Sequence, residues 1–161
     1  MKSLAIVGAC GAMVFSQVAQ AATVTDTFNV TIVIQADCAV TAPAALDFGT
    51  VGVLSANTDA TADIQVVCTS STAYEIGLDA GTTAGGTTTD RLMTDGSNTV
   101  TYRLYQDASR TVNWGETLTT DTLSSTGTGA TQSHTVYGRV PSQTTPAAGS
   151  YSDTITVTVT F

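Results

Sequence analysis

Few side chains of this sequence could take part in chemistry, and the cysteines are the first to consider. Cys10 lies within an apolar N-terminal stretch, whereas Cys38 and Cys68 lie further along the chain. If the chain is exported, as its first residues indicate, an even pair of cysteines predicts a disulfide. A Cys38–Cys68 bond would close a loop of about 30 residues and stabilise the fold by roughly 3–4 kcal/mol.

The single histidine and the acidic residues form no catalytic motif. His134 could act as a general base only beside a nucleophile and an orienting carboxylate, so we interpret it as exposed and inactive. Two isolated cysteines and one histidine are too few ligands for zinc, and no calcium-loop spacing surrounds Asp90 or Asp95. The sequence therefore predicts no metal, no cofactor and no enzyme activity. A secreted hydrolase built on two converging carboxylates is the weakest alternative.

Trp114 is the only tryptophan, and Gly115 follows it in a turn-like setting. Two interpretations are open. The side chain could cap the core of a β-sandwich, which is the favoured reading, or it could be exposed and form a platform that binds carbohydrate. The burial of Trp114 distinguishes the two.

The first 21 residues resemble a secretory signal peptide. Lys2 supplies a positive charge, residues 4–15 form a short apolar stretch, and Ala19-Gln20-Ala21 offers the small residues that a signal peptidase recognises. Cleavage is predicted after Ala21. The apolar stretch is shorter than the roughly 20 residues that span a bilayer, so an uncleaved membrane anchor is the less favoured alternative.

The charge balance after residue 21 is acidic. The sequence contains 13 acidic residues, and its only strong bases beyond Lys2 are four arginines, at 91, 103, 110 and 139. Nucleic acids and anionic membrane surfaces are bound by basic patches. We therefore expect neither as a partner, and we expect no direct membrane span.

The rest of the sequence is typical of a β-sandwich. Threonine, glycine, serine, alanine and valine dominate, and apolar residues alternate with polar ones in several short segments separated by turn residues. About 140 residues fit one domain. Strands are expected at 62–68, 74–78, 100–104, 135–140 and 155–161, with a further short segment at 46–49 and long loops at 80–89 and 119–133.

The longest alternating segment is the N-terminal run, residues 24–34. Its apolar positions share one face, with Asp26 as the only interruption, while threonines dominate the other face. This alternation predicts a strand with one buried face. The apolar positions are Val24, Phe28, Val30, Ile32 and Ile34.

The two ends of the sequence fit a sandwich that lacks a strand. The last alternating segment stops at Phe161 in mid-pattern, and only about six strands are expected in the body, against the seven of an immunoglobulin-like sandwich. A missing strand exposes an apolar groove and an unpaired edge, which a strand from another chain can cover. At this point the N-terminal run could equally pair within its own sandwich.

Short motifs along the chain resemble the spore coat U domain family, which includes the Csu-type subunits of archaic chaperone–usher pili. The match lies in their order and in the final aromatic residue. The motifs are the run into Cys38, Leu46-Asp47-Phe48-Gly49, Val67-Cys68-Thr69, Tyr74-Glu75-Ile76, Arg91-Leu92-Met93, the segment 100–107, Trp114-Gly115, Val136-Tyr137-Gly138 and the segment 146–153.

This resemblance implies an all-β, incomplete immunoglobulin-like sandwich that polymerises by donor-strand exchange into a surface fibre for adhesion and biofilm formation. The implied domains are a signal peptide (1–21), a donor segment (22–36) and a pilin-like domain (37–161). The implied partners are a periplasmic pilus chaperone, an outer-membrane usher and identical or related subunits. The implied acceptor edge and chaperone contact is the strand carrying Ile155, Val157, Val159 and Phe161. A secreted coat protein, or a stand-alone carbohydrate-binding module, is the alternative.

Overall fold

The structure is a computed structural model and describes residues 20–161. Almost all of the predicted signal peptide lies outside the described residues. Within the described residues, 20–33 and 34–161 fall into separate units, and every regular element is a β-strand. The strands are β1 (Cys38–Thr41), β2 (Thr58–Cys68), β3 (Ala73–Leu78), β4 (Arg91–Thr94), β5 (Thr99–Tyr105), β6 (Leu123–Thr126), β7 (Thr131–Val140) and β8 (Val157–Thr160).

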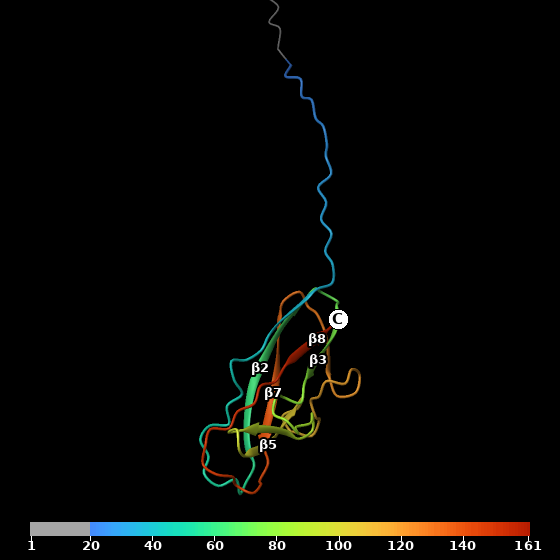
Figure 1. Ribbon diagram of the computed structural model, residues 1–161. Coiled ribbons are helices and arrows are strands. Elements are labelled where there is room, and N and C mark those ends of the chain that lie inside the picture. Colours follow the sequence, from blue (N-terminus) through green and yellow to red (C-terminus); the bar gives the residue numbers. More distant parts are fainter. Residues whose placement is uncertain (1–19) are drawn as a thin grey trace, which may run out of the picture. The chain divides into compact units, whose positions relative to one another are not determined.

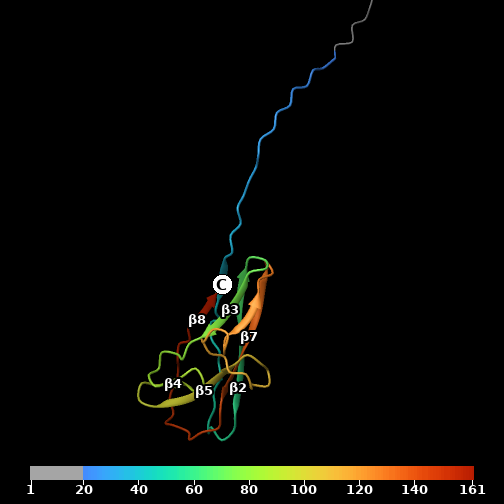
Figure 2. The same cartoon turned by 90° about the vertical axis from the view of Figure 1, so that its right-hand side faces the viewer.

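The strands form two antiparallel sheets, which confirms the predicted sandwich. One sheet has five strands in the order β1-β2-β7-β5-β4, and the other has three in the order β6-β3-β8. Figures 1 and 2 show the long strands β2 and β7 side by side, with β3 and β8 in the second layer. No helix within residues 20–161 is long and apolar enough to cross a membrane.

The core lies between the inner faces of the two sheets. Along β2, β5 and β7 the buried positions alternate with more exposed ones, as the period of a strand requires. The alternation predicted for these strands and for β3 is therefore confirmed. The buried apolar residues include Ile64, Val66, Cys68, Tyr74, Ile76, Leu78, Val100, Tyr102, Leu104, Val136 and Val140.

The strands β1 and β4 were not expected from the sequence, and two further segments fold differently from the prediction. The segment 119–133 is not one loop, because β6 pairs with β3 at Leu123–Thr126 and β7 already begins at Thr131. Both stretches are rich in threonine and serine, so their alternation is hidden. The segment 46–49 forms no strand. Instead Asp47 accepts a hydrogen bond from the Gly49 amide at 2.7 Å, and Gly49 takes a φ of 74° that suits glycine.

A buried arginine and the tryptophan tie the two sheets and their loops together. Arg91 is 0 % exposed, and its guanidinium donates to four backbone carbonyls, those of Leu78, Asp79, Thr88 and Trp114, at 2.7–2.8 Å. Trp114 is equally buried, and its indole Nε1 donates to the Ile76 carbonyl at 2.8 Å. Burial lowers the pKa of Arg91, but an arginine stays protonated at any physiological pH. The carbonyls therefore hold a permanent cation in the core.

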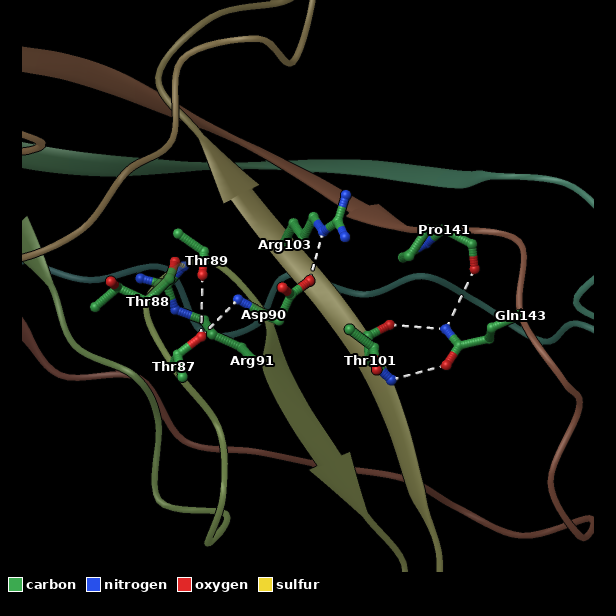
Figure 3. Close-up of polar contacts among 9 residues, drawn as sticks. All are labelled: Thr87, Thr88, Thr89, Asp90, Arg91, Thr101, Arg103, Pro141 and Gln143. Atoms are coloured by element: carbon green, nitrogen blue, oxygen red, sulfur yellow. Dashed lines mark hydrogen bonds and ion pairs between the residues drawn. The ribbon is translucent and has the colours of Figure 1, made fainter.

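A glutamine side chain extends the ladder between β5 and β7. The strand β7 ends at Val140 because Pro141 has no amide hydrogen to continue the pairing. Gln143 folds back and takes that role: its Oε1 accepts from the Thr101 amide at 3.0 Å, and its Nε2 donates to the Thr101 carbonyl at 2.9 Å (Figure 3). The same Nε2 lies 3.2 Å from the Pro141 carbonyl oxygen. Nearby, Asp90, which immediately precedes β4, pairs with Arg103 of β5 at 2.7 Å.

We expect Gln143→Met to lower the free energy of unfolding by about 1–3 kcal/mol, because it leaves the partly buried amide and carbonyl of Thr101 without partners. The exposed neighbour Ser142 offers the control, since Ser142→Ala should change stability by less than about 0.5 kcal/mol. Urea unfolding followed by Trp114 fluorescence measures both. Equal stability of the two variants would show that water replaces the glutamine.

Residues 20–33 form no strand in the structure. The apolar side chains of the N-terminal run are exposed, from 75 % at Ile34 to 95 % at Val24. The alternation of this run is that of a half-buried strand, yet no sheet of the chain covers it. The prediction of a strand with a buried face is therefore not met within the single chain.

Candidate functional site

A disulfide links the two strands that follow the N-terminal run. Cys38 opens β1, Cys68 closes β2, and the two are bonded, with a Cα–Cα distance of 4.1 Å. The predicted disulfide is thus confirmed. Around it, the Thr69 amide donates to the Asp37 carbonyl at 2.9 Å, and the Asp37 amide donates to Thr69 Oγ1 at 3.0 Å. The chain leaving the N-terminal run is therefore fixed to the five-stranded sheet.

The inner face of β1 is left uncovered. Val40 lies directly opposite Val66 of β2, so the two side chains share the inner face of the sheet. Val66 is 0 % exposed, whereas Val40 is 40 % exposed. A side chain that faces the core but remains accessible shows that no strand of the opposite sheet covers it.

The strand β8 shows the same feature at the edge of the other sheet. Val157 and Val159 lie opposite Leu78 and Ile76 of β3, both of which are fully buried. The two valines themselves are only half-buried. The strand β8 pairs with β3 on one side only, and β1 pairs with β2 on one side only. The two strands are in contact, so their unpaired edges lie on the same side of the sandwich.

Beside this edge lies an apolar groove of about 420 Å³, which we call the β1–β8 groove. One wall is the irregular segment 42–48, the other is 151–157, and the floor comes from both sheets. The lining residues are Ala42 to Leu46, Phe48, Ala62, Ile64, Leu78, Met93, Tyr102, Leu104, Val136, Tyr151 to Ile155 and Val157.

Small residues shape the first wall of the groove. Four of its members are Ala42, Pro43, Ala44 and Ala45, which leave space that larger side chains would fill. The wall then enters the core at Leu46 and Phe48, whose side chains lie on Gly138 of β7. A Cβ at Gly138 would lie within 2.9 Å of both side chains. Glycine at this point of β7 thus allows the wall to approach the sheet.

One ionised group borders the groove. Asp153 accepts a hydrogen bond from the Tyr102 hydroxyl at 2.7 Å and others from Thr82 and Thr83. Burial opposes ionisation of Asp153, but the hydrogen bonds outweigh it, so the pKa of this carboxyl lies below its usual value. Burial, with the neighbouring carboxylate, raises the pKa of Tyr102 and keeps its hydroxyl a donor.

The arginines outside the core are engaged in ion pairs away from the groove. Arg139 and Arg110 both contact Asp59, at 2.7 and 3.3 Å, and Arg103 contacts Asp90. The hydrogen bond from Arg139 lowers the pKa of Asp59. None of the four arginines lines the groove, so Asp153 is the one charged residue in its lining, and the other polar lining residues are the uncharged Tyr102, Tyr151, Ser152 and Thr154.

The structure places the predicted edge residues unequally. Ile155 and Val157 line the β1–β8 groove, and Val159 lies on the inner face of β8. Phe161 follows β8, is 57 % exposed and lines a separate shallow hollow with Ala73 and Leu118. The sequence reasoning missed the wall 42–48 and the Tyr102–Asp153 pair. A run of small residues after β1 was the only available signal for the wall.

Two other candidate residues have structural roles. Trp114 is 0 % exposed, which rules out a carbohydrate platform on this side chain and confirms its place in the core. The interpretation of His134 as exposed is wrong. It is half-buried, its Nε2 lies 2.8 Å from the Tyr74 hydroxyl, and burial lowers its pKa. Within residues 20–161 no three His, Cys, Asp or Glu side chains are placed to hold a metal ion.

Comparison with known families agrees with the order of motifs along the chain. Residues 24–158 match the Spore Coat Protein U domain. The chain belongs to the Spore Coat Protein U domain family. The resemblance seen in the sequence is thereby confirmed, and the match includes the N-terminal run and the first half of β8. No curated protein matches the sequence significantly.

A solved structure shares the fold of this Spore Coat Protein U domain. It is the crystal structure of the CsuC–CsuE chaperone–tip adhesion subunit pre-assembly complex from the archaic chaperone–usher Csu pili of Acinetobacter baumannii. The sequence identity is 25 % and the TM-score is 0.58. The match covers 80 % of this chain but only 40 % of the other.

We expect Ala62→Leu to fill part of the groove, because Ala62 lies on its floor and faces open space. Exposed apolar grooves bind apolar dyes, so the fluorescence of bis-ANS with the monomeric protein should fall by about half. The matched control is Ala39→Leu, which adds the same side chain on the outer face of β1. Equal dye fluorescence in both variants would place the accessible apolar surface elsewhere.

Proposed function

We propose that this protein is a structural subunit of a chaperone–usher surface fibre, and that subunits join by donor-strand exchange. The observation that carries the proposal is that one chain has both a segment suited to be a donor strand and a groove suited to accept one. An exposed alternating run lies at residues 24–34, and an apolar groove lies beside the unpaired edges of β1 and β8. Each feature is an aggregation hazard by itself, and each offers what the other lacks.

The donor in this proposal is the apolar face of the N-terminal run. A strand lying against β8 would gain backbone hydrogen bonds from an unpaired edge. Its side chains at Phe28, Val30, Ile32 and Ile34 would enter the space between the two walls. Full burial contributes about 1.5–3 kcal/mol for each, or about 6–12 kcal/mol before entropy is counted. Val24 belongs to the same face beyond Asp26.

Such a contact is head to tail, because the run of one copy fills the groove of the next. A heterologous contact that does not close on itself generates a fibre. The disulfide supports this geometry, since it fixes β1, which the run enters, to β2 at residue 38. A pull on the run would therefore be transmitted directly to the sheet.

The proposal requires partners before assembly. A subunit with an uncovered groove would aggregate in the periplasm, so a chaperone must cover the groove until an usher at the outer membrane admits the next run. The structurally similar Csu subunit was solved in complex with its chaperone, which supports this part of the proposal. We further propose that the exported fibre lies on the cell surface, serves adhesion and biofilm formation, and has no enzyme activity.

The domain limits follow from the same proposal. Residues 1–21 would direct export, 22–36 would be donated, and 37–161 would form the sandwich that receives a donor. The break between the last two falls between the alternating run and Cys38. It lies close to Ile34, where the structure divides the chain into units.

Substituting Val30 and Ile32 together by Asp should abolish polymers, because two carboxylates would have to enter an apolar groove that already holds Asp153. The matched control is Asn29→Asp with Thr31→Asp, which adds the same charge to the opposite face of the run. We expect the control to polymerise. Electron microscopy and denaturant-free gel electrophoresis of protein coexpressed with its chaperone and usher measure the difference.

Deleting residues 24–34 should likewise leave a soluble chaperone complex that forms no fibres, because the acceptor groove remains and the donor is gone. The chaperone complex is isolated from the periplasm by affinity purification. Polymers of normal length from this deletion would contradict the proposed role of the run.

A further inference from the structure

The wall of the groove formed by residues 151–156 is held from its outer side at three points. Ser152 exchanges two backbone hydrogen bonds with Thr94, at 2.9 and 3.1 Å. At the far end, Thr156 pairs with Asp79: the Asp79 amide donates to the Thr156 carbonyl, and the Thr156 amide donates to Asp79 Oδ1 at 2.9 Å. Between them lies Asp153. The inner side of this wall faces the groove and has no strand beside it.

Asp153 is the most heavily bonded of the three points. Its Oδ1 accepts from the amides and hydroxyls of both Thr82 and Thr83 at 2.9–3.1 Å, and its Oδ2 accepts from the Tyr102 hydroxyl at 2.7 Å. Five donors on one carboxylate fix its position closely. Gly81 makes room for this cluster, because a Cβ there would lie 1.9 Å from Asp153 Oδ2.

The Tyr102–Asp153 bond differs from the other two anchors because both of its residues line the groove, whereas Thr94, Asp79 and Thr156 do not. Tyr102 lies on β5 of the five-stranded sheet, whereas Asp153 leads into β8 of the three-stranded sheet. The bond therefore ties the wall to the floor of the groove, beside the backbone link from Ser152 to Thr94 of β4. Without it, the wall could move toward the floor and cover the exposed apolar residues, because such a collapse buries apolar surface.

We propose that Asp153 and Tyr102 are positioning residues of the groove, which hold it open for an incoming strand. The inference rests on the proposed donor-strand function. The pair acts before the strand arrives, because a bound strand would keep the walls apart by itself. Loss of the bond should therefore slow strand uptake while leaving the filled sandwich nearly unchanged.

The test uses the full chain carrying Val30→Asp and Ile32→Asp, which should not donate its own run. The probe is a fluorescein-labelled peptide with the sequence of residues 22–36, and fluorescence anisotropy follows its association. Two variants are made in this background, Tyr102→Phe and Asp153→Asn. Tyr102→Phe removes a single hydroxyl and keeps the ring on the groove floor.

The matched control is Asp107→Asn. Asp107 also fixes a loop, since its carboxylate accepts from the Thr111 amide and hydroxyl and from the Val112 amide, but it does not line the groove. We expect peptide association about tenfold slower in both test variants, which corresponds to the loss of one hydrogen bond to a charged group. The control should associate at the background rate. The melting temperature of the peptide-loaded protein should fall by less than a few degrees in Tyr102→Phe.

The outcomes separate the inference from the function on which it rests. Uptake by Tyr102→Phe and Asp153→Asn within twofold of the background rate would overturn the positioning role. So would slower uptake accompanied by an equally large loss of stability in the loaded protein, because the pair would then stabilise the fold in general. A background protein that is folded, by its Trp114 fluorescence, yet binds no peptide would overturn the donor-strand function as well.

Discussion

The structure depends on one constraint: a β-sandwich must cover the inner faces of both of its sheets, and this one does so everywhere except beside β1 and β8. There Val40 is exposed opposite a buried valine, and Val157 is half-buried opposite a buried leucine. Uncovered apolar surface favours collapse or association. The remaining features of the molecule can be understood as ways of keeping the rest of the fold fixed while this edge stays open.

Polar groups with fixed hydrogen-bond partners, and the disulfide, hold the sandwich in shape where a complete apolar core would otherwise do so. Arg91 donates hydrogen bonds to four carbonyls from three separate segments, and the disulfide fixes the start of β1. Gln143 completes a ladder that Pro141 interrupts. Each of these contacts is directional, whereas apolar packing is not. A sandwich whose core is uncovered beside β1 and β8 can hold its shape through such contacts without closing the groove.

The sequence predicted those parts of the fold that follow local periodicity. The strands around Ile64, Ile76 and Tyr102 alternate strictly, and the structure has them where expected. The strand β6 was missed because only Leu123 among its residues is strongly apolar. The groove wall was missed for a different reason. Segment 42–48 is irregular backbone, and the Tyr102–Asp153 bond joins residues 51 positions apart, so no local pattern reveals either.

The N-terminal run shows why local pattern and tertiary structure can disagree without error in either. Alternation predicts that a segment will pair with a sheet and bury one face, but it does not predict which chain contains that sheet. In a chain whose strands are all satisfied internally, such a run would be buried. Here its apolar side chains are 75–95 % exposed from Val24 to Ile34, while β1 and β8 each keep an unpaired edge. One chain thus carries an exposed alternating run and a sandwich with two unpaired edges, and the proposed exchange of strands between copies would satisfy both.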